Sequence, residues 1–167
     1  MRTRKTTMVL SWSLVIFWML LIFYLSSQTG SESNLLSRTV TDWLIKIFGP
    51  YITLDIQTST LTDVVTVLNN EVRNAGHILL YFILGILVIN SVIHNGRKLF
   101  RGFHISLFVC LMYSISDEIH QIYVPGRGFE MHDILLDNIG ALMGIVLFGS
   151  VKAFFYLCFG ERLLTKK

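Results

Sequence analysis

The chain has 167 residues, of which 53% are hydrophobic and only 15% are charged. Soluble domains carry about 25% charged residues, so this chain cannot bury its apolar surface in one water-soluble core, and the bilayer must act as its solvent. The length fits one compact domain, and the net charge of +3 arises beside apolar runs, where it indicates membrane topology and lipid headgroups and not nucleic acid.

Four apolar segments are long enough, or nearly so, to cross a bilayer, which takes about 20 helical residues. They lie at residues 8–25, 76–93, 103–119 and 134–157. The first segment follows basic residues, but it is longer than a signal-peptide core and no small-residue cleavage pattern follows it, so we expect a retained anchor. The prediction is an all-α, polytopic membrane protein with one domain over residues 1–167 and four transmembrane helices.

The distribution of Lys and Arg predicts the orientation of these spans. With the N-terminus in the cytoplasm, ten of the 14 basic residues fall on the cytoplasmic side, whereas Glu161 is the one acidic residue there. We therefore expect both termini in the cytoplasm and the segment 26–75 on the outer side of the membrane.

The outer segment is too long for a bare loop, and its pattern predicts two helices. Apolar residues recur with helical spacing over residues 31–48, so an amphipathic helix should start at Ser31 or Ser33 and end at Gly49-Pro50. With Trp43 on its apolar side, this helix either lies in the headgroup layer or packs over the bundle. Residues 59–74 predict a second helix, starting near Thr60 and Asp63, that leads into the second span.

Three sets of polar residues should meet at the outer mouth of an antiparallel four-span bundle. Their members follow in chain order: Ser26, Ser27 and Gln28; then Arg73, His77 and Tyr81; then Asp117, Glu118, His120, Gln121, Arg127, His132, Asp133 and Asp137.

Helical spacing indicates how some of these side chains point. Asp117, His120 and Gln121 should share one face, which Glu118 flanks. Asp133 and Asp137 share a stripe that continues into a G-x-x-x-G pattern at residues 140–144, and small residues in that pattern usually face a neighbouring helix. We therefore expect Asp137 to point into the bundle, because an acid facing hydrocarbon costs roughly 2.5–3.5 kcal/mol.

Structural roles are the alternatives for single members of these sets. Asp133 would cap the fourth span, Glu118 would form a buried ion pair with Arg127, His77 would bond a backbone carbonyl, and Arg73 would lie at the headgroups. For the whole set a functional site is the better interpretation, because ionisable residues near the membrane core are rarely tolerated without a role.

The residue types suit acid–base chemistry on a lipid-linked ester or phosphate. Candidate catalytic residues are His77, Asp117, Glu118, His120, Asp133 and Asp137. Candidate substrate-binding residues are Ser27, Gln28, Arg73, Tyr81, Gln121 and Arg127, with the Arg127 guanidinium holding an anion from a Pro-Gly turn. A divalent metal held by the same His and carboxylate side chains is an alternative, although their spacing matches no established ligand signature.

Several of these patterns also resemble one known family. They are S-D-E-I-H-Q at 116–121, V-P-G-R at 124–127, Asp133, Asp137, G-A at 140–141, W-M at 18–19, F-Y-L-S-S-Q at 23–28, R-N-A-G-H at 73–77, Tyr81 and L-G at 84–85. Together they resemble the VanZ-like bacterial membrane proteins over nearly the whole chain. The family is named after an accessory protein that lowers susceptibility to teicoplanin. That founding type is similar at Glu118, Gln121 and Asp133 but not at His120 or the Pro-Gly-Arg turn, so the resemblance alone does not imply teicoplanin resistance here.

Three functions follow as hypotheses. The first is an envelope hydrolase or transferase that acts at the outer leaflet on a phospholipid or a lipid-linked cell-wall precursor. The second is a non-enzymatic membrane modulator that binds an envelope precursor, an antibiotic or a partner protein. The third, a small transporter or proton-coupled channel, is less well supported because few ionisable residues lie in the inner half of the spans.

Overall fold

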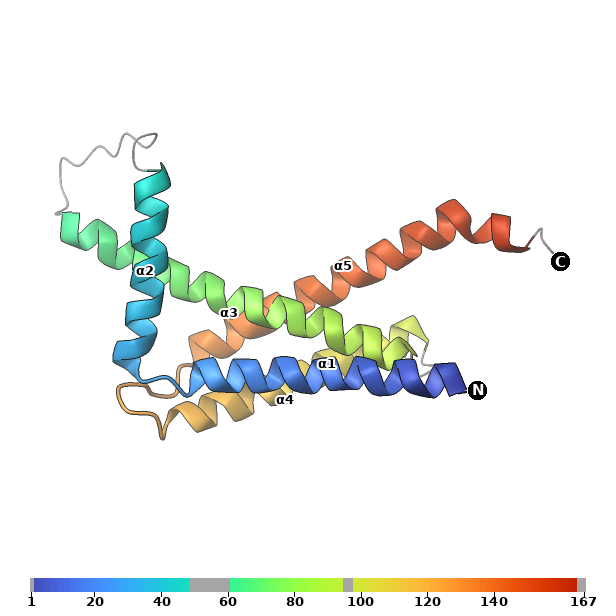
Figure 1. Cartoon of the computed structure of the whole chain (residues 1–167), viewed down its shortest axis with the longest axis horizontal. Helices are drawn as coiled ribbons and strands as arrows, with labels where there is room; N and C mark the ends of the chain where they lie inside the picture. Colours follow the sequence, from blue (N-terminus) through green and yellow to red (C-terminus); the bar gives the residue numbers. More distant parts are fainter. Residues whose placement is uncertain (1, 49–60, 95–97, 165–167) are drawn as a thin grey trace.

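Five α-helices make up the part of the chain that the computed structural model describes, residues 2–48, 61–94 and 98–164 (Figure 1). They are α1 (Arg2–Ser26), α2 (Gly30–Phe48), α3 (Leu61–His94), α4 (Leu99–Gln121) and α5 (Met131–Leu164). All but α2 contain an apolar stretch able to cross a membrane, at Lys5–Ser26, Asp63–His94, Leu99–Gln121 and Met131–Phe155. The predicted all-α, polytopic membrane protein is therefore confirmed.

Helix α3 differs from the prediction because it is continuous. The segment expected to form a separate helix before the second span joins that span without a break, since no proline interrupts the chain between Leu61 and His94. At 1.5 Å per residue α3 is roughly 50 Å long, well beyond the ~30 Å of the hydrocarbon layer. The expected helix start at residues 59–60 and the expected stop at residues 49–50 lie outside the described residues.

The core lies around α3, which contacts every other helix. Tyr81, Leu84 and Val88 of α3 are buried together with Cys110 of α4 and Ala141 of α5. Helix α1 is joined to this core by two hydrogen bonds. The Trp18 indole N–H donates to the Leu80 carbonyl oxygen at 2.9 Å, and the Tyr113 hydroxyl of α4 donates to the Met19 carbonyl oxygen.

Glycines allow α3 and α5 to approach each other closely. A Cβ added at Gly140 would overlap the backbone carbonyl oxygen of Ile78, and one added at Gly144 would overlap that of Phe82. The prediction that the G-x-x-x-G stripe faces a neighbouring helix is confirmed, and the neighbour is α3.

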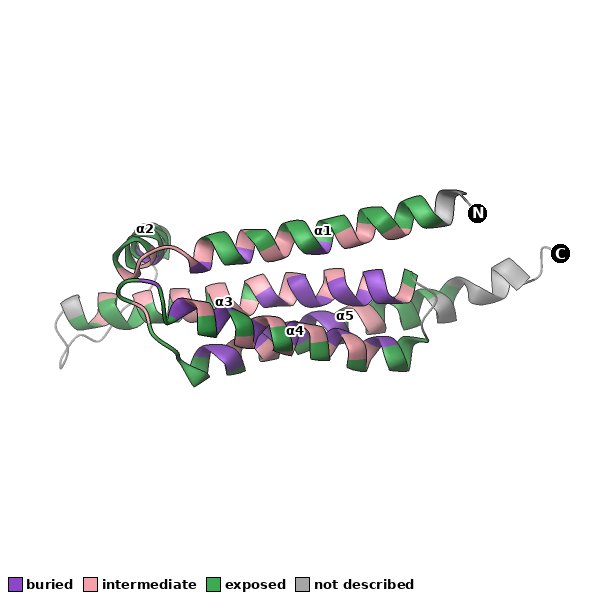
Figure 2. Cartoon of the chain, turned by 90° about the horizontal axis from the view of Figure 1, so that it is seen from below, coloured by how far each residue is buried: buried purple, intermediate pink, exposed green. Residues whose placement is uncertain are grey.

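Helix α2 lies across the end of the bundle, nearly perpendicular to α1, and Figure 2 shows it end-on. It starts at Gly30, so the expected start at Ser31 or Ser33 is wrong. Thr29 and Glu32 form a capping box in which the Thr29 hydroxyl accepts from the Glu32 N–H at 3.3 Å and the Glu32 carboxylate accepts from the Thr29 N–H at 3.0 Å. Two hydrogen bonds from Thr29 lower the pKa of Glu32. The bond from the Thr29 backbone has the larger effect, and the bond from its side chain adds to it.

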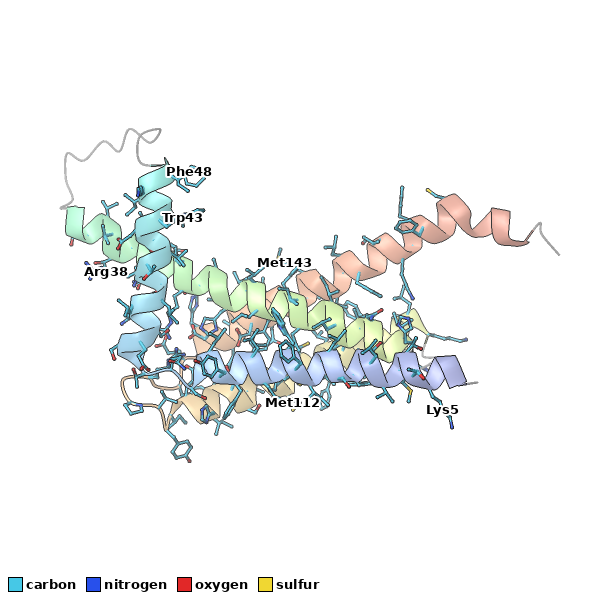
Figure 3. The ribbon with its side chains drawn as sticks, viewed as in Figure 1. Lys5, Arg38, Trp43, Phe48, Met112 and Met143 are labelled. Atoms are coloured by element: carbon cyan, nitrogen blue, oxygen red, sulfur yellow. The ribbon has the colours of Figure 1, made fainter. Side chains whose placement is uncertain are left out.

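The side of α2 that packs against the bundle is its small polar side. Ser37 and Thr41 are buried, whereas Leu35 and Trp43 are 67% and 62% exposed. In Figure 3, Trp43 and Phe48 point toward the end of the bundle where the chain termini lie, and Arg38 points the opposite way. The apolar side of α2 therefore does not pack over the bundle, which was one of the two expected arrangements.

We predict that Gly140→Ala lowers the free energy of unfolding in detergent by about 1–3 kcal/mol, because its methyl group forces α3 and α5 apart. Gly149→Ala is the matched control on the same helix, since a Cβ there meets no neighbouring atom. Chemical denaturation followed by tryptophan fluorescence measures both. Equal stability of the two variants would show that the contact between α3 and α5 is less tight than the geometry indicates.

Candidate functional site

The polar sets come together at the end of the bundle opposite the chain termini, where α1 ends, α2 crosses and α5 begins (Figure 1). Two groups can be distinguished there. One is a network of ion pairs and hydrogen bonds between α3, α4 and α5, and the other is a set of side chains around a cavity.

His77 is the centre of the first group, which we call the histidine–aspartate network: Arg73, His77, Ser114, Asp133 and Asp137. The Nδ1 atom of His77 lies 3.0 Å from Oδ1 of Asp137, and Nε2 lies 3.4 Å from Oδ2 of Asp133. An Arg73 Nη2 atom is 3.4 Å from the same Asp133 oxygen. The Ser114 hydroxyl donates to Oδ2 of Asp137 at 2.9 Å.

The network decides between several of the structural alternatives. His77 binds two carboxylates instead of a backbone carbonyl, and Arg73 pairs with Asp133. Asp133 lies in the first turn of α5, where the helix dipole favours a negative charge, but it also takes part in these ion pairs. Asp137 is fully buried and points into the bundle, as its spacing predicts. Ser114 was not expected here, because a lone serine in an apolar run gives no signal.

Glu118 and Arg127 do not form the ion pair that was considered. The buried Glu118 carboxylate accepts a hydrogen bond from the Glu130 N–H at 2.8 Å. An Arg127 Nη2 atom donates instead to the Leu25 carbonyl oxygen, at 3.4 Å. Glu118 therefore holds the loop that leads into α5, and Arg127 has no carboxylate partner among the described residues.

Of the three residues expected to share one face of α4, the first and last line the cavity and the middle one does not. Asp117 and Gln121 both line it, and the Gln121 amide donates to the Ser26 hydroxyl at 2.8 Å. His120 lies against α1, with Nε2 3.1 Å from the Ser27 hydroxyl and its ring 4.5 Å from that of Phe23.

Two further members of the expected sets also lie away from the cavity. The Gln28 amide donates to the Tyr24 carbonyl oxygen at 3.3 Å, within the end of α1. His132 is exposed at the start of α5.

The Pro-Gly turn is clamped to the start of α2. Gly126 has a φ of 75°, which favours glycine, and the Gly30 N–H donates to the Pro125 carbonyl oxygen at 3.0 Å. A Cβ on Gly30 would overlap the Gly126 carbonyl oxygen. This contact holds Arg127 beside the end of α1. It could not be predicted from the sequence, because nothing around Gly30 indicates a distant partner.

A cavity of about 390 Å³ lies between α1, α2 and α3. Its walls are largely apolar side chains of these three helices. Its principal polar lining consists of Arg73, His77, Tyr81, Asp117, Gln121 and Arg127. The contribution of α2 was not anticipated, because the amphipathic pattern does not show which residues face α3.

Four of the lining residues carry a buried polar atom that has no hydrogen-bond partner among the described residues. These atoms are Tyr81 Oη, Asp117 Oδ1, Gln121 Oε1 and Arg127 Nε. A buried polar atom without a partner costs about 1–3 kcal/mol, and such atoms are rare in proteins. Four of the seven such atoms among the described residues belong to side chains that line this cavity.

Burial lowers the pKa of the Arg127 guanidinium, and the neighbouring Arg73 lowers it further. An arginine nevertheless stays charged at neutral pH, because its ordinary pKa is above 12. Arg127 therefore brings a positive charge to the cavity wall, and no carboxylate of the described residues pairs with it directly.

The alternative of a metal site finds no support in the geometry. No group of three or more His, Cys, Asp or Glu side chains suited to an ion is present in residues 2–48, 61–94 and 98–164.

One comparison with known proteins gives a result. A family model described as VanZ/LLP1 matches residues 11–155, which include most of the first span, the apolar stretches of the other three and every residue of the cavity and the network. No curated protein and no solved structure matches the chain.

We predict that His77 and Asp137 are energetically coupled. In a double-mutant cycle, His77→Gln and Asp137→Asn should show an interaction energy of about 0.5–3 kcal/mol, because each variant removes the same hydrogen bond. Unfolding in detergent measures it. The control pairs Asp137→Asn with His104→Gln, whose Nδ1 contacts its own helix at the Phe100 carbonyl oxygen, and these changes should be additive. Additivity in both cycles would contradict the observed bond.

Proposed function

The chain belongs to the VanZ/LLP1 family, and we propose that it is a cell-envelope protein that processes a lipid or lipid-linked substrate at the outer face of the cytoplasmic membrane. One observation carries the proposal. The cavity combines apolar walls with an unpaired guanidinium, a histidine held by a carboxylate and four buried polar atoms without partners. Such a lining matches an amphiphile with an anionic group.

The geometry supports His77 as the acid–base group. Its Nδ1 is held by Asp137 at 3.0 Å, whereas Nε2 makes only the longer 3.4 Å contact with Asp133. The Asp137 carboxylate on Nδ1 fixes the ring orientation, and Nε2 exchanges a proton with the substrate once the substrate replaces its contact with Asp133. His120 is a weaker candidate because it contacts Ser27 outside the cavity lining.

The proposed reaction is hydrolysis or transfer at an ester or phosphoester bond. A hydroxyl oxygen, of water or of an acceptor alcohol, attacks the phosphorus or carbonyl carbon while His77 takes its proton. The bond to the leaving oxygen then breaks, and the imidazolium returns the proton to that oxygen. Arg127 and Arg73 stabilise the negative charge that develops on the attacked group.

We predict that His77→Gln and Arg127→Gln each lower turnover about 100-fold or more, the lower end of what an acid–base group contributes. Purified protein in proteoliposomes made from total envelope lipid is incubated, and products are identified by mass spectrometry. His104→Gln and Arg38→Gln are the controls, since both residues lie away from the cavity lining. Unchanged lipids with the wild-type protein, or full activity of His77→Gln, would refute an enzymatic role.

A second candidate function is suggested by α2. Its exposed apolar side, with Trp43 62% exposed, favours a non-enzymatic modulator that binds an envelope precursor, an antibiotic or a partner protein. Under this proposal Trp43→Ala changes the teicoplanin susceptibility of cells as much as His77→Gln does. The enzymatic proposal expects a change with His77→Gln and little change with Trp43→Ala.

The orientation that we propose places the cavity outside and the start of α1 and end of α5 in the cytoplasm. It is supported by the ten of 14 basic residues at that end and by the position of both ends opposite the cavity (Figure 1).

We predict that Phe129→Cys reacts with a membrane-impermeant maleimide in intact cells and that Lys5→Cys reacts only after lysis. Both variants carry Cys158→Ser, because Cys158 is exposed whereas Cys110 is buried. Phe129 is 47% exposed, so its replacement is accessible. The reverse labelling pattern would place the cavity on the cytoplasmic side.

A further inference from the structure

We propose that the cavity opens sideways into the bilayer between α2 and α3, and that it binds the headgroup of an anionic membrane lipid whose hydrocarbon chains stay outside. The proposal rests on the proposed function, since it names the substrate class of the same site. It adds a route of entry and excludes water-soluble headgroup compounds as ligands.

Three apolar side chains lie at the edge of the cavity, and we call them the rim: Leu36 and Val40 of α2 and Leu79 of α3. All three line the cavity, yet they are 55%, 47% and 58% exposed. Ile22 on the inner wall is only 2% exposed. The rim therefore belongs both to the cavity and to the outer surface, so the cavity has an apolar opening there.

The rim lies at the membrane-spanning stretch of α3 and beside the apolar stripe of α2. Leu79 lies within the apolar stretch Asp63–His94, about 9 Å farther along α3 than Arg73 at 1.5 Å per residue. On α2, Leu36, Val40 and Trp43 follow the spacing of one helical stripe, so the rim continues into the Trp43 side of that helix. Figure 3 shows Trp43 and Arg38 pointing in opposite directions, which is the arrangement of a helix lying in the interface with its apolar side toward hydrocarbon.

The charges of the cavity wall are complementary to an anionic headgroup. Arg127 Nε is buried without a partner, and the carboxylate nearest to Arg73 is already shared with His77. A guanidinium presents a planar set of donors that fits a phosphate or carboxylate group. An anionic headgroup supplies that acceptor. The wall holds two guanidinium groups against one carboxylate, Asp117, so it favours an anionic headgroup over a zwitterionic one, which also brings a cation.

The cavity is large enough for a lipid headgroup but not for a whole lipid. A volume of about 390 Å³ is near the lower end of small-molecule pockets, which run from roughly 300 to 1,000 Å³. It fits a headgroup and not a complete two-chain lipid. The chains must therefore leave through the opening, and hydrocarbon against Leu36, Val40 and Leu79 costs no desolvation because the rim is apolar.

The test uses the full chain in nanodiscs that contain a trace of phosphatidylglycerol with a photoactivatable diazirine in its acyl chain. After irradiation, mass spectrometry locates the labelled peptides. We expect labelling at residues 36–40 and 79 that is about tenfold stronger than with the matching phosphatidylcholine probe. We expect Arg127→Gln to abolish that preference, since the variant removes the positive charge and the donors that bind the anionic headgroup. Millimolar glycerol 3-phosphate should not compete.

Rim variants provide the matched comparison. Leu36→Trp and Leu79→Trp should block the opening and reduce labelling of the cavity wall at least fivefold. Leu35→Trp should leave it unchanged, because Leu35 is a neighbouring exposed leucine of α2 that does not line the cavity. Equal labelling with both lipids, full competition by glycerol 3-phosphate, or an equal effect of Leu35→Trp would each overturn the proposal.

The outcome also separates this proposal from the proposed enzymatic function. Rim labelling as expected, but without product from any envelope lipid, supports the lateral opening and contradicts the enzyme. Product formation from a soluble short-chain substrate at the same rate in wild type and Leu36→Trp contradicts the opening and supports the enzyme.

Discussion

The backbone contact between α3 and α5 determines the geometry of the whole site. Gly140 lies against the Ile78 carbonyl oxygen, one residue from His77 on α3 and three residues from Asp137 on α5. A side chain at residue 140 would hold the helices apart, and His77 would no longer reach two carboxylates. The small residues thus do more than pack helices, because they bring a histidine within 3.0 Å of an acid inside the bundle.

The polar residues at the end of the bundle opposite the chain termini divide into two groups with different energetics. In the histidine–aspartate network each charged group has a partner, which compensates for burying it in a membrane protein. Around the cavity, by contrast, Tyr81, Asp117, Gln121 and Arg127 each have a buried polar atom without a partner. The first group positions His77, and under the proposed function the second supplies donors and acceptors to a ligand.

Much of the fold follows from the sequence, because span length, helical periodicity and charge bias are local properties. They predict four apolar helices, the inward direction of Asp137 and the contact face at Gly140 and Gly144. Thr29 as the cap of α2 was missed even though its T-x-x-E signal was present. The clamp of Gly30 on Gly126 and the partnership of Ser114 with Asp137 depend on which helices become neighbours, and periodicity alone does not contain that information.

Binding of the anionic group of a membrane lipid by Arg127 can be tested by measuring magnetic dipolar coupling between the two. In bilayers containing phosphatidylglycerol, solid-state NMR can measure contacts between lipid ³¹P and ¹⁵N-labelled arginine side chains of the full chain. We expect ³¹P to dephase one guanidinium signal of the wild-type protein. That signal should be lost in Arg127→Gln while the other arginine signals are unchanged. Identical dephasing in the two proteins would contradict it.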